Sequence, residues 1–240
     1  MDKSSWGRFG KSKMIWNKKF IYPPSTRSLI ENQRHYEIGT AKLPSVTTIL
    51  QETMPQEKKD SLEKWKLRVG ETEADRIRDH AAERGTIMHR ILEGYLTGHR
   101  HSDLSDLGQQ AGVMATNIWE TDLRDNMQEI WGTEIVVYYP ELYAGATDLV
   151  GIYAGRESII DFKQSNKFKR REWVTDYFFQ LAGYALAHNV MHNTKIQCGV
   201  ILMCTADNVF QKFVVKEQEF QRYMWGWLRR VSEFYGHLPH

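Results

Sequence analysis

The stretch Gly145-Ala-Thr-Asp-Leu-Val-Gly-Ile-Tyr-Ala-Gly-Arg-Glu-Ser-Ile-Ile-Asp-Phe-Lys163 decides the fold, because it predicts two short strands joined by a tight turn. Leu149, Val150 and Ile152 form the first apolar run, and Ser158-Ile159-Ile160 leads the second, so both runs contain β-branched residues. Residues 154–157 lie between the runs and include Gly155, which suits a reversal of the chain. A β-hairpin is therefore the expected centre of the molecule.

Three charged side chains lie in this hairpin. Asp148 belongs to the first strand, while Asp161 and Lys163 stand two apart in the second and so point to the same face. Charges on apolar strands are costly to bury unless something compensates them, and a divalent cation would do so. Mg²⁺ prefers oxygen ligands, and the backbone carbonyl of Phe162 is a further oxygen between the two charges. The alternative is that these are solvated charges at strand ends.

Such a site would suit the cleavage of a phosphodiester bond. Metal ions held by carboxylates neutralise the phosphate, lower the pKa of a water and stabilise the leaving oxygen. A lysine beside them, here Lys163, can orient or deprotonate the water and offset negative charge.

The rest of the chain alternates predicted helices and strands around the hairpin. Ser45 is expected to cap a short helix, and Leu62, Trp65 and Val69 share one face of the next, while Val113 is expected to point inward. The predicted helices are 55–79 with a break at Gly70, 81–96, 112–130, 173–190 and 219–235, and the further strands are 36–38, 133–139, 196–204 and 209–215. This order predicts an α/β fold in which helices cover a mixed central sheet.

The chain divides into a basic N-terminal arm at 1–43, a helical region at 44–130, the sheet and helix of the core at 131–216, and a C-terminal helix at 217–240. The formal charge of +2 does not indicate a nucleic-acid binder, but its distribution is uneven. Residues 1–30 contain seven Lys or Arg and one Asp. A second basic run lies beside the hairpin and consists of Lys167, Lys169, Arg170 and Arg171. Both runs could contact phosphates or be solvated surface.

Two predicted helices carry further candidate residues. His89 and Glu93 lie four apart on one stripe of a helix. His89 could complete a metal shell, for which an imidazole suits Mn²⁺ better than Mg²⁺, or be an exposed residue, and Glu93 could support it or face solvent. Gln180 and Tyr184 are also one helical turn apart and could bind a phosphate oxygen or be satisfied polar ends of a packed face. Glu134 could be an additional acidic ligand or a solvated charge on an edge strand.

Four ordered motifs are Gly85-x-x-x-His89, Gly145-x-x-Asp148, Asp161-x-Lys163 and Gln180-x-x-x-Tyr184. In this order they resemble the PD-(D/E)XK nucleases of RecB type. Upstream, Leu43-Pro-Ser-Val-Thr-Thr-Ile-Leu50, then Trp65 and Gly70, then residues 81–86 are more similar to the mitochondrial genome maintenance exonuclease family and its phage relatives. The resemblance covers roughly residues 34–205.

This resemblance implies a restriction-endonuclease-like core in which helices flank a central mixed sheet in the order αβββαβ. It implies Mg²⁺ or Mn²⁺ bound by His89, Asp148, Asp161 and the Phe162 carbonyl, with Lys163 as the catalytic lysine. Gln180 and Tyr184 are implied as further catalytic and DNA-contacting residues. We also expect Arg84 to contact nucleic acid.

Some RecB-type nucleases hold a four-cysteine iron–sulfur cluster, which the two cysteines of this chain, Cys198 and Cys204, exclude. The chain has no helicase or ATP-binding motif, so a helicase, a polymerase or a single-strand-binding protein is an expected partner, or the DNA is already single-stranded. Residues 44–96 are expected to form a roof of helices over the site. We expect no membrane span, and a cytoplasmic location in a bacterial or phage-infected cell rather than a mitochondrial one.

The resulting hypothesis is a metal-dependent DNA exonuclease that acts on single-stranded DNA with a free end. A structure-specific endonuclease that cuts flaps is the alternative enzyme. A non-catalytic nucleic-acid-binding module on a nuclease scaffold is the alternative from another class.

Overall fold

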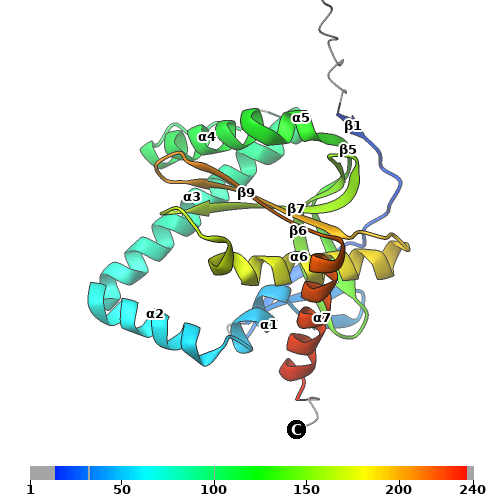
Figure 1. Cartoon of the computed structure of the whole chain (residues 1–240), viewed down its shortest axis with the longest axis horizontal. Coiled ribbons are helices and arrows are strands. Elements are labelled where there is room, and N and C mark those ends of the chain that lie inside the picture. Colours follow the sequence, from blue (N-terminus) through cyan, green and yellow to red (C-terminus); the bar gives the residue numbers. More distant parts are fainter. Residues whose placement is uncertain (1–13, 32, 100, 237–240) are drawn as a thin grey trace, which may run out of the picture.

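A six-stranded mixed sheet runs through the centre of the computed structural model, which describes residues 14–31, 33–99 and 101–236 (Figure 1). Its strands follow the spatial order β1 (Ile15–Trp16), β5 (Met127–Tyr139), β6 (Tyr143–Tyr153), β7 (Arg156–Ser165), β8 (Cys198–Thr205) and β9 (Phe210–Lys216). The pairs β5–β6, β6–β7 and β8–β9 are antiparallel, whereas β1–β5 and β7–β8 are parallel. A parallel pair needs a crossover, and α6 (Thr175–His192) provides it between β7 and β8.

Helices cover both faces of this sheet. One face packs against α3 (Glu71–Thr97) and α4 (Asp106–Ile118), and the other against α1 (Val46–Glu52), α6 and α7 (Glu217–Phe234). Neighbouring strand residues alternate between the two cores. Leu149, Ile160 and Leu202 belong to the core under α3 and α4, while Val150, Ile159 and Ile201 belong to the core under α6 and α7. The sheet is thus fixed from both sides, which confirms the predicted α/β class.

The predicted hairpin is confirmed as β6 and β7, and the chain reverses at Ala154 and Gly155. Both turn residues have positive φ, 47° and 76°, which suits the twist of a tight hairpin. Ser45 caps α1 as predicted, because its side chain accepts a hydrogen bond from the backbone N–H of Thr48. The two cysteines both lie in β8, where they are buried and free.

The helix predicted at 112–130 has different limits. It begins at Asp106, where Ser105 caps it, and it ends through a π turn (Trp119–Leu123) and a short α5 (Arg124–Asn126). Residues 127–130 belong to β5 instead, because pairing with β6 outweighs their helical pattern. Val113, expected to point inward, is 54% exposed.

A second, three-stranded sheet occupies much of the predicted N-terminal arm. It consists of β2 (Thr26–Ile30), β3 (Gln33–Ile38) and β4 (Ala41–Pro44), of which only 36–38 was predicted. Tyr36 and Leu43 pack it against Ala144 of β6. Residues 1–13 of the arm, with several of its basic residues, lie outside the described part of the chain.

The helix α2 (Gln56–Val69) stands away from the rest of the molecule and meets α3 at an angle at Gly70 (Figure 1). None of its side chains is buried, so the face predicted from Leu62, Trp65 and Val69 is not part of a core. Lys58 near its start forms an ion pair of 2.7 Å with Asp176 of α6. α2 is therefore tied to the core near its start and through α3 at its other end.

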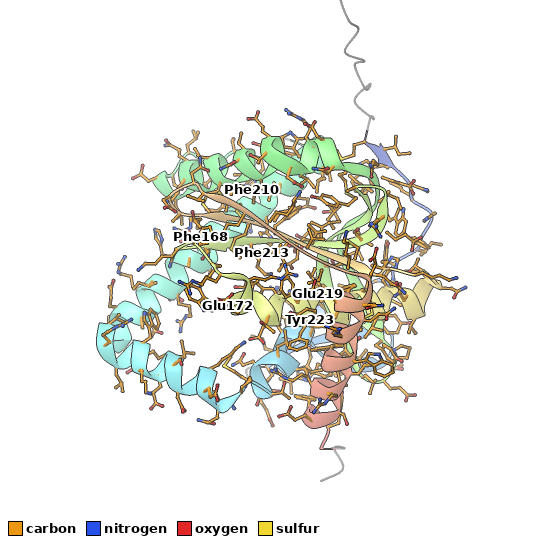
Figure 2. All side chains as sticks on the ribbon, viewed as in Figure 1. Phe168, Glu172, Phe210, Phe213, Glu219 and Tyr223 are labelled. Carbon is orange, nitrogen blue, oxygen red and sulfur yellow. The ribbon has the colours of Figure 1, made fainter. Side chains whose placement is uncertain are left out.

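The C-terminal helix α7 packs on α6 through the fully buried Phe220 and Trp227. Figure 2 shows Glu219 and Tyr223 of α7 beside the segment that leads into α6, where Arg171 binds Glu219 at 2.7 Å. No helix in the described ranges has both the length and the apolar composition needed to cross a bilayer.

Gly145 of β6 leaves room for the ring of Tyr184, because an added Cβ would lie 2.4 Å from its Cε1 atom. The ring is buried and cannot move aside freely. We therefore expect Gly145→Ala to lower the free energy of unfolding by about 1–3 kcal/mol, as overpacking does in other cores. Urea unfolding followed by tryptophan fluorescence measures the change.

Gly112→Ala is the matched control. Gly112 lies in α4, and an added Cβ there would meet its nearest neighbour, Cδ1 of Ile91, at an ordinary contact distance of 3.9 Å. Replacing a helical glycine by alanine should leave stability equal or raise it by up to about 1 kcal/mol. Equal unfolding curves for the two variants would contradict the tight fit at Gly145.

Candidate metal-binding cleft

Acidic side chains from three adjacent strands meet at one place beside α3. Glu134 lies on β5, Asp148 on β6 and Asp161 on β7. Glu134 stands opposite Asp148 in the ladder, since Thr133 pairs with Leu149 and Ile135 with Thr147. One ligand atom each from His89, Glu134 and Asp148 lies within 4.8 Å of the other two. These three side chains could therefore hold one metal ion.

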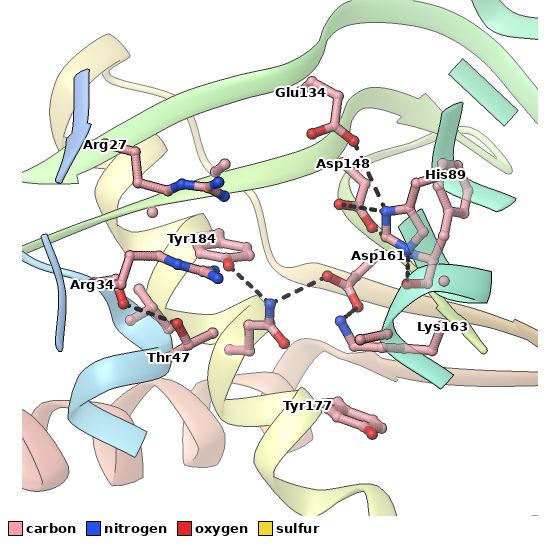
Figure 3. Close-up of a pocket in the computed structure, with 18 of the residues that line it drawn as sticks. Arg27, Arg34, Thr47, His89, Glu134, Asp148, Asp161, Lys163, Tyr177 and Tyr184 are labelled. Atoms are coloured by element: carbon pink, nitrogen blue, oxygen red, sulfur yellow. Dashed lines mark hydrogen bonds and ion pairs between the residues drawn. The ribbon is translucent and has the colours of Figure 1, made fainter. Parts of the chain in front are cut away.

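Hydrogen bonds fix the orientation of Asp148 and His89. Asp148 Oδ2 accepts a bond of 2.6 Å from the backbone N–H of Phe162, and its Oδ1 lies 3.5 Å from His89 Nδ1. His89 Nε2 donates to the Phe162 carbonyl at 2.8 Å, because a carbonyl can only accept. The Phe162 carbonyl, expected as a metal ligand, is thus bound to His89, and Nδ1 is the ring nitrogen directed at the carboxylates (Figure 3).

Asp161 is held from two sides. Its Oδ2 forms an ion pair with Lys163, and its Oδ1 lies 3.4 Å from Nε2 of Gln180, which also donates to the Tyr184 hydroxyl at 2.8 Å. Asp161 Oδ2 is buried and accepts no hydrogen bond of good geometry from the described residues, so the Lys163 ammonium is its main compensation. The predicted proximity of Asp161, Lys163, Gln180 and Tyr184 is therefore present.

The three acids are incompletely neutralised. Burial and the nearby Asp148 carboxylate raise the pKa of Glu134 to about 7, and burial raises the pKa of Asp161 to about 6 against the opposing effect of Lys163. Burial also disfavours charged Asp148, but His89 and Lys163 hold its pKa below the usual value. Burial opposes protonation of His89, yet Asp148 raises its pKa to about 9. Oxygen ligands with excess negative charge fit a hard divalent cation.

The backbone at Glu134 is strained. Its φ of 52° lies in the left-handed region, which is rare for a residue other than glycine inside a strand. Such strain costs about 1–3 kcal/mol and is common at functional sites. The sequence left Glu134 open between an extra ligand and a solvated charge, and the structure places it with His89 and Asp148.

The acids line one side of a cleft of about 500 Å³. Gln180, Tyr184 and Tyr177 of α6 line it as well, and Lys163 Nζ lies 5.1 Å from the centre of the Tyr177 ring. Arg27 and Arg34 project into the cleft from the β2–β3 hairpin (Figure 3). Neither Arg27 nor Arg34 was predicted from the sequence as a site residue. Only the basic character of residues 1–30 could have indicated Arg27.

The other basic residues that we expected to bind nucleic acid do not line the cleft. Arg84 is 3% exposed, and its guanidinium donates to Gln164, Gln110 and Asn166. It joins α3 to β7, so its donors are not free for a phosphate. Arg171 binds Glu219 and the Val214 carbonyl. Lys167, Lys169 and Arg170 lie on the segment that leads into α6, where Arg170 stacks over Trp173.

The sequence is similar to those of several exonucleases. The chain is 29% identical over 204 residues to mitochondrial genome maintenance exonuclease 1 of Mus musculus and 29% identical over 216 residues to that of Xenopus tropicalis. The relative of the same name from Homo sapiens is 26% identical over 204 residues, so the chain is similar in sequence to all three of these exonucleases. The first two matches cover 80% and 84% of this chain and 59% of each relative, so the chain spans about three fifths of their length. The resemblance stated from the motifs is confirmed.

Two solved structures match this chain at low sequence identity and with TM-scores below 0.5. A candidate exonuclease from Eubacterium rectale matches 67% of this chain and 69% of its own, with a TM-score of 0.45 and 16% identity. An alkaline exonuclease from Laribacter hongkongensis matches 62% of this chain and 80% of its own, with a TM-score of 0.26 and 10% identity. No family model matches the sequence.

The role of Glu134 as a metal ligand can be tested without a substrate. At pH 8, above its raised pKa, Glu134 is charged and repels Asp148. Glu134→Gln removes this repulsion, which solvent screens in part because the side chain is 42% exposed. We therefore expect the thermal midpoint without metal to rise by only about 2–4 °C, which is about 1 kcal/mol for a chain of this size. The increase in midpoint on adding Mn²⁺ should become smaller, because one ligand is lost.

Glu141→Gln provides the control, since Glu141 is also a glutamate with positive φ but lies outside the cleft, in the turn after β5. Its replacement should change neither the midpoint nor the response to Mn²⁺. If both variants respond to Mn²⁺ as the unmodified protein does, Glu134 is not a ligand.

Proposed function

We propose that this protein is a metal-dependent exonuclease that hydrolyses phosphodiester bonds in single-stranded DNA with a free end. The observation that supports the proposal most strongly is the convergence of Glu134, Asp148 and Asp161 beside His89 and Lys163. The homologues named as exonucleases support a nuclease function as well.

In this proposal His89, Glu134, Asp148 and Asp161 would hold the cation. The bound Mg²⁺ or Mn²⁺ would neutralise the phosphate and lower the pKa of a water. Burial disfavours a charged lysine, but Asp161 and Asp148 raise the pKa of Lys163, so it remains an ammonium. Lys163 then orients a water or stabilises negative charge on the phosphate, rather than removing a proton as a neutral amine would.

The role of Gln180 follows from its position between two partners. Its amide nitrogen reaches Asp161 and also donates to the Tyr184 hydroxyl. Gln180 thus keeps Asp161 Oδ1 in a fixed direction, and the Tyr184 hydroxyl remains able to donate its own proton to a phosphate oxygen.

The surroundings of the acids support a single strand as substrate. A hollow of about 560 Å³ between α1, α2 and α6 shares Thr47, Tyr177 and Gln180 with the cleft. Another of about 470 Å³ shares Arg27, Arg34 and His89 with it. The three spaces therefore adjoin one another beside the acids, and residues of α3 and of the β2–β4 sheet line two of them. This arrangement would suit a strand whose bases are unpaired.

The test is digestion of end-labelled DNA in Mg²⁺, in Mn²⁺ and in EDTA. We expect linear single-stranded DNA to be degraded only with metal, and circular single-stranded DNA to stay intact. Lys163→Ala should lower kcat by a factor of about 10²–10³, because it removes a charge next to the reacting phosphate. Asp161→Asn should abolish cleavage through loss of a metal ligand.

Lys195→Ala is the control, because Lys195 is exposed in the connection between α6 and β8. It should leave cleavage unchanged. Cleavage of circular DNA would favour the endonuclease alternative. Full activity of Lys163→Ala or Asp161→Asn would show that the acids of this cleft are not the active site.

A further inference from the structure

We propose that Arg27 and Arg34 form a binding subsite for the phosphate that neighbours the scissile one on the DNA strand. This inference rests on the proposed nuclease function for the word scissile, but the binding itself can be measured without cleavage. The β2–β4 sheet, which carries none of the candidate metal ligands, would then contribute to DNA binding.

The register of the small sheet directs both arginines to the same side. Arg27 pairs with Tyr36 across the β2–β3 ladder, and Arg34 lies two residues before Tyr36 on β3. Directly paired residues and residues two apart share one face of a sheet. Arg27, Arg34 and Tyr36 therefore all face the cleft, and all three line it. Figure 3 shows the two guanidinium groups on the opposite side of the cleft from His89 and Lys163.

The backbone of Arg34 is held firmly. Its carbonyl accepts hydrogen bonds from the backbone N–H of Ser45 at 2.9 Å and from the Thr48 hydroxyl at 2.8 Å. Ser45 and Thr48 are both buried, and they belong to the stretch 43–50 that carries the sequence resemblance. That stretch thus fixes the position of Arg34 relative to the core.

Both guanidinium groups lack a carboxylate partner within residues 14–31, 33–99 and 101–236. This separates them from Arg76, Arg78 and Arg171, each of which pairs with an acid of the protein. An arginine whose five donors are unused in a concave cleft is suited to bind phosphate oxygens in a bidentate manner.

The neighbouring hollow indicates which phosphate is bound. Arg27 and Arg34 line both the cleft with the acids and the adjoining space, which is also lined by Thr86 and Arg90. The scissile phosphate belongs beside the acids and Lys163. A strand that continues from there towards Arg90 brings its next phosphate to the two arginines.

The experiment measures binding of a fluorescent oligothymidylate by anisotropy over a range of salt concentrations, in a Lys163→Ala background. The double variant Arg27→Gln/Arg34→Gln should bind at least about tenfold more weakly. Because each phosphate neutralised on a single strand contributes about 0.7 to the salt slope, loss of this one phosphate contact should lower the slope by about 0.7. The control Arg222→Gln/Arg229→Gln has the same charge change on α7, outside the cleft, and should bind as the background does.

The position of the contacted phosphate is found with oligonucleotides that carry one neutral methylphosphonate linkage. A methylphosphonate at one position next to the scissile bond should weaken binding to the Lys163→Ala protein. The same substitution should cause no further loss of binding in the Arg27→Gln/Arg34→Gln variant, which is the signature of a direct contact. Additive losses at every position would overturn the proposal, and so would equal binding by both double variants.

Cleavage assays with native Lys163 separate this proposal from the nuclease function. Arg27→Gln/Arg34→Gln should raise KM with kcat changed only a few-fold, whereas Lys163→Ala should lower kcat by a factor of about 10²–10³. If neither the unmodified protein nor the variants cleave DNA, the proposed nuclease function is wrong, while the binding result still stands.

A second variant covers the case in which the glutamine variant does not fold. Arg27→Lys/Arg34→Lys retains the positive charge, so it should keep the salt slope but bind DNA more weakly, because the fork geometry of the guanidinium groups is lost. Unchanged binding by the lysine variant would overturn a bidentate contact.

Discussion

The burial of Asp148 and Asp161 in the β6–β7 hairpin is the constraint on which the rest of the structure depends. Two carboxylates inside a sheet are tolerated only with specific compensation, since isolated buried charges are very unfavourable. The compensation comes from three directions: the Phe162 N–H within β7, His89 from α3, and Lys163 two residues beyond Asp161. The helix α3 therefore has to pack closely on the sheet at this point, and Gly85 permits this, because an added Cβ would lie 3.3 Å from Gln164.

The two apolar cores supply the rigidity that such a site needs. Leu149 and Ile160 anchor the hairpin beneath α3 and α4, while Val150 and Ile159 anchor it beneath α6 and α7, and all four are fully buried. The hairpin cannot shift towards either layer without opening a cavity, which costs several kcal/mol for large aliphatic side chains. Backbone strain at Glu134 is maintained in the same way, because long pairing between β5 and β6 on both sides holds the strand in place.

The sequence predicted those features that depend on local spacing. The hairpin and the α1 cap follow from periods and capping signals that a single segment reveals. The association of His89, Asp148, Asp161, Lys163, Gln180 and Tyr184 was instead implied by the resemblance of their ordered motifs to the PD-(D/E)XK nucleases. Arg27 and Arg34 could not be predicted, because their approach to the acids depends on the packing of a small exposed sheet on Ala144. The same limitation applies to Arg84 and Arg171, whose charges are used inside the protein by residues distant in sequence. A basic run in a sequence does not show where its partners lie.

The strand β6 links the two sides of the cleft. Ala144 receives Tyr36 and Leu43 of the small sheet, and Gly145 admits the ring of Tyr184. Four residues after Ala144, Asp148 reaches His89. The spacing between the arginines and the acids is therefore set within five residues of one central strand rather than by flexible connections. The proposed nuclease function needs this fixed spacing, because a phosphate contact would contribute to cleavage only when it holds the next phosphate of the strand at the acids.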